Sequence, residues 1–306
     1  MSHEISVRSA NTVEQRAAAL ELLFSRSDPA ERAEQVAEAV AAHETQQFDL
    51  SGLLIAYHVS DAAGAALTVS QEDGTTYVWP PVAEANSVQG AVVDALFDAI
   101  HERVPQAGSW LGQCLLEPHQ TADSEALERN DFSHMAELQF LSRSLADPLP
   151  DRPVEMFQKI EFNEQDNQFR FAKLLEATYQ GSLDCPNFSG LRTGEEALAS
   201  HRTAGEFSPN LWNLYEVDGQ DAGVLLFARH SEENTWEVAY TGIHPAARGR
   251  GLGKAILLDG MHEALQAGVG NILLAVDSNN KYALKVYREL GFLGVGQRSV
   301  FIKVYR

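Results

Sequence analysis

The sequence predicts an α/β protein built from two tandem halves of one type, each a twisted mixed sheet flanked by helices. Segments of helical and of strand periodicity alternate along the chain. The order of elements in the first half returns in the second, offset by about 160 residues. A chain of 306 residues suits two domains, each able to bury its own core.

The first half is expected to run strand, two helices, three strands, helix, strand, helix and strand. Turn residues such as Asp61, Gly64 and Asp73-Gly74 separate the three central strands. The expected elements are residues 5–8, 13–24, 28–43, 53–59, 65–70, 75–79, 87–103, 110–116, 124–129 and 136–143.

The second half repeats this order and adds a distinctive loop. Its expected elements are a strand at 157–162, helices up to 179 and at 195–201, and strands at 211–217, 223–229 and 235–243. A helix starting at Leu252, a strand at 271–276 and a helix at 281–290 follow. Residues 144–153, with three prolines and several acids, are expected to form a stiff linker. The predicted domains are therefore 1–146 and 147–306.

The loop Arg248-Gly249-Arg250-Gly251-Leu252-Gly253 lies between a strand and a helix. Glycines let an anion approach the backbone N–H groups closely, at the positive end of the helix dipole. Three cations crowd this turn, and no acid lies between His244 and Leu258. The pattern predicts a phosphate-binding site, and its spacing fits neither the Walker loop nor the dinucleotide loop.

The spacing R-x-x-G-x-G (Arg248, Gly251, Gly253) resembles the acetyl-coenzyme-A loop of the GNAT acyltransferase superfamily. A second pattern, N-x-x-A-x-x-x-Y-x-x-x-G-F, follows at Asn280, Ala283, Tyr287, Gly291 and Phe292 and is similar to that family's next signature. The resemblance covers residues 155–306. It implies a fold of GNAT type and transfer of an acetyl group from acetyl-CoA to a primary amine by direct attack. The acetyl-CoA contacts it implies are Gly242, Ile243, His244, Arg248, Gly249, Arg250, Gly251, Leu252, Gly253, Lys254, Asn280 and Ala283.

Two catalytic residues follow from the resemblance. Tyr287 is at the position where the family usually carries the tyrosine that protonates the departing thiolate; alternatively it is a core tyrosine. Glu237 is at the position of the catalytic glutamate of some members; alternatively it is an ordinary strand residue in solvent. His244 is a second candidate base.

Other polar residues have two interpretations each. Asn280 either contacts the pantetheine arm of the cofactor or caps its helix. Cys185 stands in the turn-rich stretch that in this fold covers the acceptor site, but no base partner for a catalytic thiol is evident. No metal site is predicted.

The first half lacks this loop. Pro80-Pro81 follows its third central strand, and Leu127 stands where Tyr287 stands in the second half. We expect a degenerate GNAT-like domain that supports the structure and shapes the acceptor cleft.

Composition limits the partners. The net charge of −20 argues against nucleic acid and anionic membranes. Residues 1–146 carry 7 Arg, no Lys and 22 acids (net −15), against 16 basic and 21 acidic residues in 147–306 (net −5). The acidic first half favours a cationic acceptor, either a small molecule or a peptide amine. Two cysteines make no disulfide framework, and no signal peptide or membrane span is expected, so we predict a cytoplasmic protein.

The sequence does not predict the acceptor's identity or the oligomeric state. It leaves one alternative function open, a catalytically silent acyl-CoA-binding or structural protein.

Overall fold

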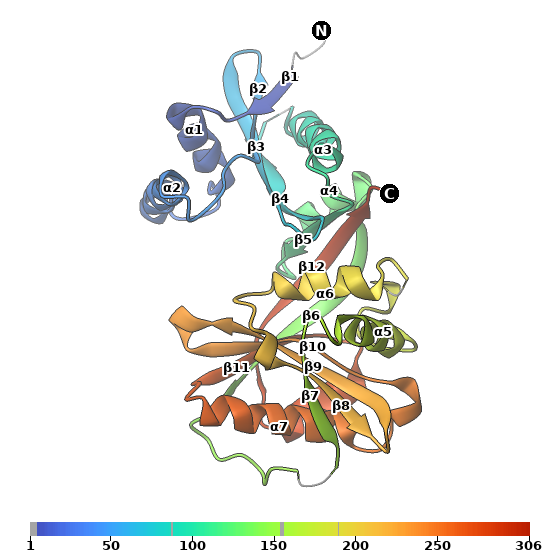
Figure 1. The fold of residues 1–306 in the computed structure, drawn as a ribbon. Helices are drawn as coiled ribbons and strands as arrows, with labels where there is room; N and C mark the ends of the chain where they lie inside the picture. The colour runs from blue at the N-terminus through green and yellow to red at the C-terminus, as the bar shows by residue number, and fades with distance from the viewer. Residues whose placement is uncertain (1–4, 87, 154–155, 189) are drawn as a thin grey trace. The chain divides into compact units, whose positions relative to one another are not determined.

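The computed structural model describes residues 5–86, 88–153, 156–188 and 190–306 (Figure 1). The chain forms two compact units. Unit 1 runs to His134 and includes Ser299–Arg306, and unit 2 is Met135–Arg298. The alternation of strands and helices that the sequence predicts is confirmed in both.

Unit 1 is a sheet with helices on both faces. Its strands lie in the order β1-β2-β3-β4-β5-β12, antiparallel except for the parallel pair β4–β5. One face packs on α1 and α2, and the other on α3 and α4. The elements of the first half of the chain are β1 (Ile5–Ser9), α1 (Val13–Leu23), α2 (Pro29–Glu44), β2 (Leu53–His58), β3 (Asp61–Ser70), β4 (Thr75–Ala83), α3 (Gln89–Gln106), β5 (Leu111–Leu116), α4 (Thr121–Arg129) and β6 (Ser133–Ser144), and β6 belongs to unit 2 from Met135 onward. The predicted start of α3, Ser87, lies outside the described residues.

Unit 2 repeats this arrangement. Its strands lie in the order β6-β11-β10-β9-β8-β7, antiparallel except for the parallel pair β10–β11. Helices α5 and α6 cover one face, and α7 and α8 cover the other. The elements of the second half of the chain are β7 (Gln158–Glu161), α5 (Gln168–Tyr179), α6 (Gly194–Arg202), β8 (Trp212–Val217), β9 (Gln220–His230), β10 (Thr235–Ile243), α7 (Leu252–Gln266), β11 (Asn271–Asp277), α8 (Lys281–Glu289) and β12 (Leu293–Val304), and β12 belongs to unit 1 from Ser299 onward.

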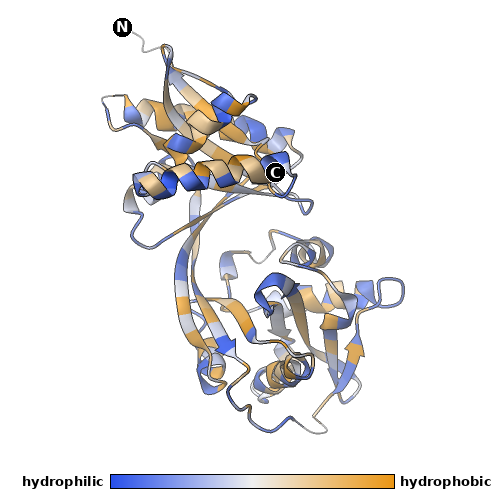
Figure 2. Cartoon of the chain, turned by 90° about the vertical axis from the view of Figure 1, so that its left-hand side faces the viewer, coloured by the Kyte–Doolittle hydropathy of each residue, from blue (hydrophilic) through white to orange (hydrophobic). Residues whose placement is uncertain are grey.

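Equivalent elements of the two halves are separated by a nearly constant number of residues. β4 starts at Thr75 and β10 at Thr235, 160 residues later, and the starts of β6 at Ser133 and of β12 at Leu293 have the same spacing. In each unit apolar residues run along the strands and the inner sides of the helices, while polar residues gather in the loops (Figure 2). The predicted duplication is thus present in the fold.

The last strand of each half joins the sheet of the other half. β6, from the first half, pairs with β11 over seven residues, Asn271 to Asp277. The C-terminal part of β12 pairs with β5 from Ser299 to Val304. The units therefore differ from the predicted domains 1–146 and 147–306, because strand pairing depends on contacts distant in sequence that a boundary at a proline-rich linker does not reveal.

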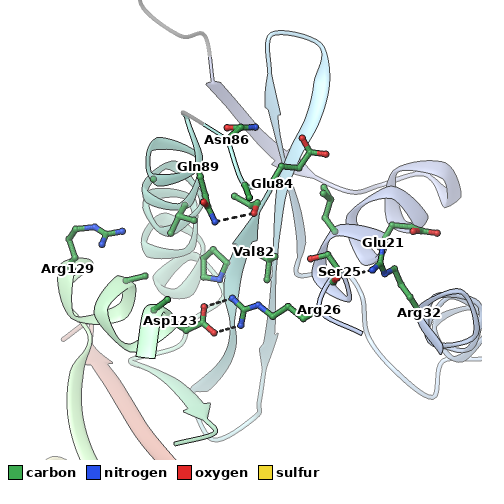
Figure 3. Close-up of a pocket in the computed structure, with 18 residues that line it drawn as sticks. Glu21, Ser25, Arg26, Arg32, Val82, Glu84, Asn86, Gln89, Asp123 and Arg129 are labelled. Carbon is green, nitrogen blue, oxygen red and sulfur yellow. Dashed lines mark hydrogen bonds and ion pairs between the residues drawn. The ribbon is translucent and has the colours of Figure 1, made fainter. Parts of the chain in front are cut away.

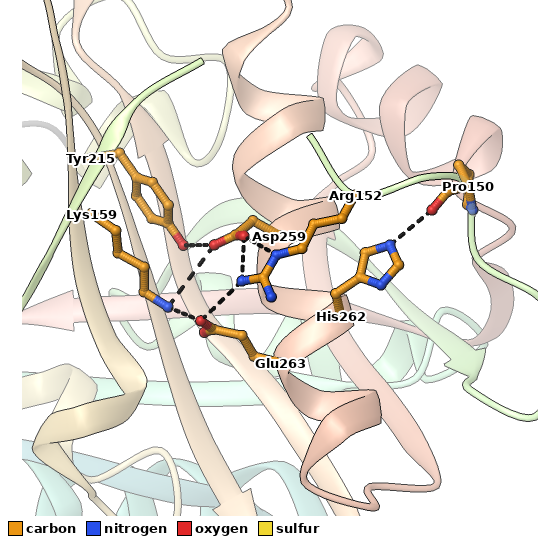
Figure 4. Close-up of polar contacts among 7 residues, drawn as sticks. All are labelled: Pro150, Arg152, Lys159, Tyr215, Asp259, His262 and Glu263. Carbon is orange, nitrogen blue, oxygen red and sulfur yellow. Dashed lines mark hydrogen bonds and ion pairs between the residues drawn. The ribbon is translucent and has the colours of Figure 1, made fainter. Parts of the chain in front are cut away.

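The predicted linker is anchored within unit 2. Arg152 Nε donates to Asp259 Oδ1 (2.7 Å), and Lys159 pairs with Glu263 (Figure 4). The buried Tyr215 hydroxyl donates to Asp259 Oδ2 at 3.4 Å. Two cations thus face two carboxylates, and the nearly buried Asp259 is fully paired. This cluster holds the end of the linker and β7 against α7.

None of the described helices is long and apolar enough to cross a membrane.

Candidate functional site

The glycine loop between β10 and α7 adopts a conformation that requires glycine. Gly249 and Gly251 both have φ of +78°, in the left-handed region. A Cβ atom at either position would meet no atom within 4 Å, so the backbone conformation, and not crowding, selects glycine. Gly251 is the N-cap residue of α7 and offers no side chain to the helix.

The first turn of α7 consequently keeps free N–H groups. Among the described residues, the backbone N–H groups of Leu252, Gly253 and Lys254 donate to no acceptor, whereas the N–H of Ala255 donates to the Gly251 carbonyl at 3.2 Å. Free N–H groups at the positive end of a helix of 15 residues favour an anion. The loop therefore has the geometry of an anion site.

The cations of this loop are engaged with the protein. Arg248 donates to the Ile243 carbonyl (3.1 Å) and to the Thr178 carbonyl (2.8 Å), which ties the end of α5 to the end of β10. Arg250 pairs with an acid, Asp218, at 3.4 Å, and Lys254 with Glu289 at 2.7 Å. These last two ion pairs are exposed and contribute little free energy. Either cation can therefore exchange its acidic partner for a ligand anion.

The strand β10 has an open edge just before the loop. It pairs with β11 only from Thr235 to Val238, and its register with β9 shifts between Val238 and Tyr240. β11 continues to Asp277 on its other side, paired with β6. From Tyr240 to Ile243, β10 has no ladder partner on the β11 side among the described residues. The two central strands thus separate beside the free amides of α7, and Gly242, Ile243 and His244 lie at this opening.

Glu237 lies on β10, one residue from the core residues Trp236 and Val238 and on the opposite face of the sheet. Its carboxylate oxygen Oε2 is 2.8 Å from His230 Nε2. The two side chains are 26% and 28% exposed, so Glu237 is neither free in solvent nor fully buried. The sequence did not single out His230, because it stands at the end of β9 in no recognisable motif.

Tyr287 lies on α8, with 7% of its surface exposed, and its ring packs against Phe292 with centroids 5.7 Å apart. Burial raises the pKa of its hydroxyl, and the charge of Asp184 adds to the effect. The phenol is therefore protonated at neutral pH. Among the described residues, its hydroxyl makes no hydrogen bond, although it belongs to the main core cluster of unit 2.

Asp184 and Asp277 form a latch that sequence reasoning missed. The Asp277 N–H donates to Asp184 Oδ1 (2.9 Å), and the Cys185 N–H donates to Asp277 Oδ2 (3.2 Å). Burial raises the pKa of Asp184, although hydrogen bonds from the Asp277 backbone and the Asn280 side chain oppose this. The latch fixes the segment after α5 to the start of α8. The residues around Asp184 form no motif in the sequence that would predict its contact with Asp277.

Asn280 and Cys185 have structural positions. The Asn280 side chain accepts from the Ala283 N–H at 3.2 Å and caps α8, while Ala283 itself packs against the core. Burial raises the pKa of the Cys185 thiol to about 12, and the charges of Asp184 and Asp277 act in the same direction. A thiol held protonated at neutral pH is a poor nucleophile, so the structure disfavours a catalytic Cys185.

Unit 1 contains a cavity of about 900 Å³ between the α1–α2 region, β4, α3 and α4, which correspond in chain order to the α5–α6 region, β10, α7 and α8 of unit 2. It is lined by residues of the α1–α2 region, the end of β4 and the segment before α3, and α4 (Figure 3). Arg26 donates two hydrogen bonds to the nearly buried Asp123 across it. Glu84 and Asn86 lie between β4 and α3, the connection that corresponds to the one between β10 and α7 in unit 2.

Among the described residues, no group of three or more histidines, cysteines or acids is placed to hold a metal ion.

Comparison with known proteins gives consistent results. Residues 175–292 match the acetyltransferase (GNAT) family. A mycothiol acetyltransferase of Mycolicibacterium gilvum is 30% identical over 202 residues, which cover 63% of this chain and 63% of that protein. One of a Nocardioides species is 52% identical over 56 residues, 18% of this chain and 19% of that protein. The matched stretches thus span less than two thirds of these relatives' length.

Solved structures support the fold alone. A GCN5-related N-acetyltransferase of Sphaerobacter thermophilus has a TM-score of 0.62 at 17% identity, covering 99% of this chain and 96% of that one. A tandem GNAT protein from the clavulanic acid biosynthesis pathway has a TM-score of 0.51 at 14% identity, covering 99% of each chain. The second of these shares the tandem arrangement.

Proposed function

Because this chain belongs to the GNAT acetyltransferase family through residues 175–292, we propose that unit 2 transfers an acetyl group from acetyl-CoA to a primary amine. The observation that carries the proposal is the opening between β10 and β11 beside the uncapped start of α7. At this opening, the unpaired backbone of β10 can bind an extended amide-containing arm. The free N–H groups at the start of α7 can bind phosphates.

The contacts with acetyl-CoA follow from this placement. We propose that the pyrophosphate lies on the N–H groups of Gly249 to Lys254, with Arg250 and Lys254 leaving their exposed acid partners for it. The pantetheine arm pairs with Gly242, Ile243 and His244. Arg248, held by two carbonyls, shapes the loop rather than moving to the ligand. Asn280 and Ala283 position the start of α8 beside the arm.

In the proposed reaction the acceptor nitrogen attacks the thioester carbonyl carbon. The C–N bond forms, the C–S bond breaks, and the electron pair of that bond leaves on sulfur. Glu237, paired with His230, takes the proton that the ammonium must lose. Tyr287, whose raised pKa keeps it protonated, donates its proton to the thiolate and takes back the second proton, which the nitrogen loses after the attack.

Acetyl-CoA is expected to bind the full chain with a stoichiometry of one. Among the described residues, only unit 2 has the glycine conformation with the free amides, while the cavity of unit 1 is crossed by the Arg26–Asp123 pair. Isothermal titration calorimetry measures this directly. A stoichiometry of two would show that the cavity of unit 1 also takes the cofactor, and no binding would refute the proposed function.

The alternative is a protein that binds acyl-CoA without turnover. Release of free thiol from acetyl-CoA in the presence of amines separates the two, because a silent binding protein gives calorimetric binding and no thiol. The acceptor is proposed to be a small molecule or peptide amine, and a cytoplasmic location stays a prediction.

A further inference from the structure

A cluster of aromatic rings lies against β10 on the face covered by α5 and α6. The Tyr179 and Tyr240 rings have centroids 5.3 Å apart, and His201 stacks on Tyr240 at 5.1 Å. The Tyr240 hydroxyl is 2.8 Å from Thr178 Oγ1. A Cβ atom at Gly242 would lie 2.7 Å from that same hydroxyl, so the cluster reaches the open edge of β10.

Arg192 lies on this cluster and lacks an acid. Its guanidinium carbon is 5.0 Å from the centroid of the Phe188 ring and 5.7 Å from that of Tyr179. One terminal nitrogen donates to the Tyr179 hydroxyl at 3.2 Å. Its Nε is buried with no hydrogen-bond partner, and no carboxylate lies within ion-pair distance of it among the described residues.

This arrangement costs free energy unless a ligand completes it. A buried N–H donor without an acceptor loses its hydration, and the penalty is larger for a charged group. Arg16, Arg32 and Arg229 also bury an unpartnered Nε, but of these four only Arg192 lies over aromatic rings of the described residues, and one of those rings, Tyr179, contacts Tyr240 of β10. The nearby Asp184 forms no ion pair with Arg192 among the described residues; its Oδ1 accepts from the Asp277 N–H at 2.9 Å.

Among the described residues, Arg192 is the cation that lies over the rings of the cluster, whereas Arg248 donates to the backbone carbonyls of Thr178 and Ile243. Burial lowers the pKa of His201 well below its usual value, and the charge of Arg192 lowers it further, so His201 is neutral. A single guanidinium with neutral hydroxyls around it balances one negative charge. That matches a carboxylate, whose two oxygens fit the guanidinium fork, better than a phosphate monoester with its higher charge.

We propose that Arg192 binds a carboxylate of the acceptor, so that the amine acetylated by unit 2 belongs to an amino acid or another amino-carboxylate. The inference rests on the proposed acetyl transfer. Aromatic faces on the guanidinium fix its plane before the acceptor arrives, which limits the entropy lost on binding. Arg192 is a specificity residue and takes no part in the bond changes.

The test compares acceptors that differ only in charge. Thiol release from acetyl-CoA is measured with the standard α-amino acids, β-alanine and γ-aminobutyrate, each against its carboxamide, and with O-phosphoethanolamine against ethanolamine. Wild-type protein is expected to prefer at least one acid over its amide by about 10- to 100-fold in kcat/KM, the range for a hydrogen bond to a charged group. Arg192→Gln removes this preference, mainly through a higher KM for the acid, and leaves the amides unchanged. Arg192→Lys retains part of it.

Arg202→Gln is the matched control. Arg202 also lies over aromatic rings, those of Phe162 and Phe207, but it pairs with Glu164 at 3.0 Å. This variant should keep the preference for acids. Equal losses for acids and amides in Arg192→Gln would assign Arg192 a structural role, and a preference for amides or for O-phosphoethanolamine would overturn the proposal.

A binding measurement decides the question without turnover. Ligand-observed NMR follows N-acetyl amino acids and their amides on the protein with CoA present. The acids should bind wild-type protein and not Arg192→Gln, and failure of any acid to bind wild-type protein contradicts the proposal. Acetyl-CoA binding, measured separately, reports on the proposed function, so the two failures are distinguishable.

Discussion

Tyr287→Phe is expected to lower kcat by ~10²–10⁴-fold, the usual contribution of general acid catalysis, with little change in the affinity for acetyl-CoA. The substitution keeps the ring that packs on Phe292 and removes only the hydroxyl, which makes no hydrogen bond among the described residues. Folding should therefore be unaffected. Steady-state kinetics with calorimetry of acetyl-CoA separates the two effects.

The control for this variant is Tyr282→Phe. Tyr282 stands on the same helix, α8, but is 69% exposed, so loss of its hydroxyl should leave kcat unchanged. A kcat of wild-type size in Tyr287→Phe would leave Tyr287 as a core residue alone, and the proton for the thiolate would then come from solvent.

A fragment of residues 147–306, cut at the boundary that the sequence suggests, is expected not to fold. It lacks β6, which pairs with all seven residues of β11 and buries Leu141 in the core of unit 2. Arg143, whose Nε donates to the Leu290 carbonyl at 2.9 Å, is lost as well. Backbone hydrogen bonds contribute about 0.5–1.5 kcal/mol each, so losing this strand removes free energy comparable to the whole ~5–15 kcal/mol stability of a domain.

The matched fragment is 135–306, which restores β6. It is expected to be soluble, to unfold cooperatively and to bind acetyl-CoA. Circular dichroism and thermal melting compare the two. Equal melting temperatures for 147–306 and 135–306 would mean that β6 adds nothing to unit 2.

Sequence reasoning predicted the local elements because their signals are local. The end of β10, the glycine loop and the start of α7 at Leu252 were expected from strand composition, turn residues and helical spacing. In the first half, Pro80 and Pro81 led to a predicted strand end at residue 79, which is too early. β4 continues to Ala83 through Pro80 and Pro81, because its parallel pairing with β5 ends at Tyr77 and leaves those residues no ladder partner on that side among the described residues.

Pairing between strands that are distant in sequence could not be predicted from local patterns. β6 and β12 carry equivalent patterns 160 residues apart, so nothing local tells which sheet each joins. The Asp184–Asp277 latch, the His230–Glu237 pair and the environment of Arg192 likewise arise from residues brought together by the fold. The roles of Tyr287 and Glu237 are predictions that rest on the family resemblance, not on strand or helix periodicity.

Hydrogen–deuterium exchange with and without acetyl-CoA tests the central claim most directly, because the proposed site consists largely of backbone N–H groups. We predict that the cofactor slows exchange at residues 240–244, on the open edge of β10, and at 249–254, at the start of α7. Residues 79–86 of unit 1 should exchange at an unchanged rate. Protection of residues 79–86 with none at 249–254 would contradict the account.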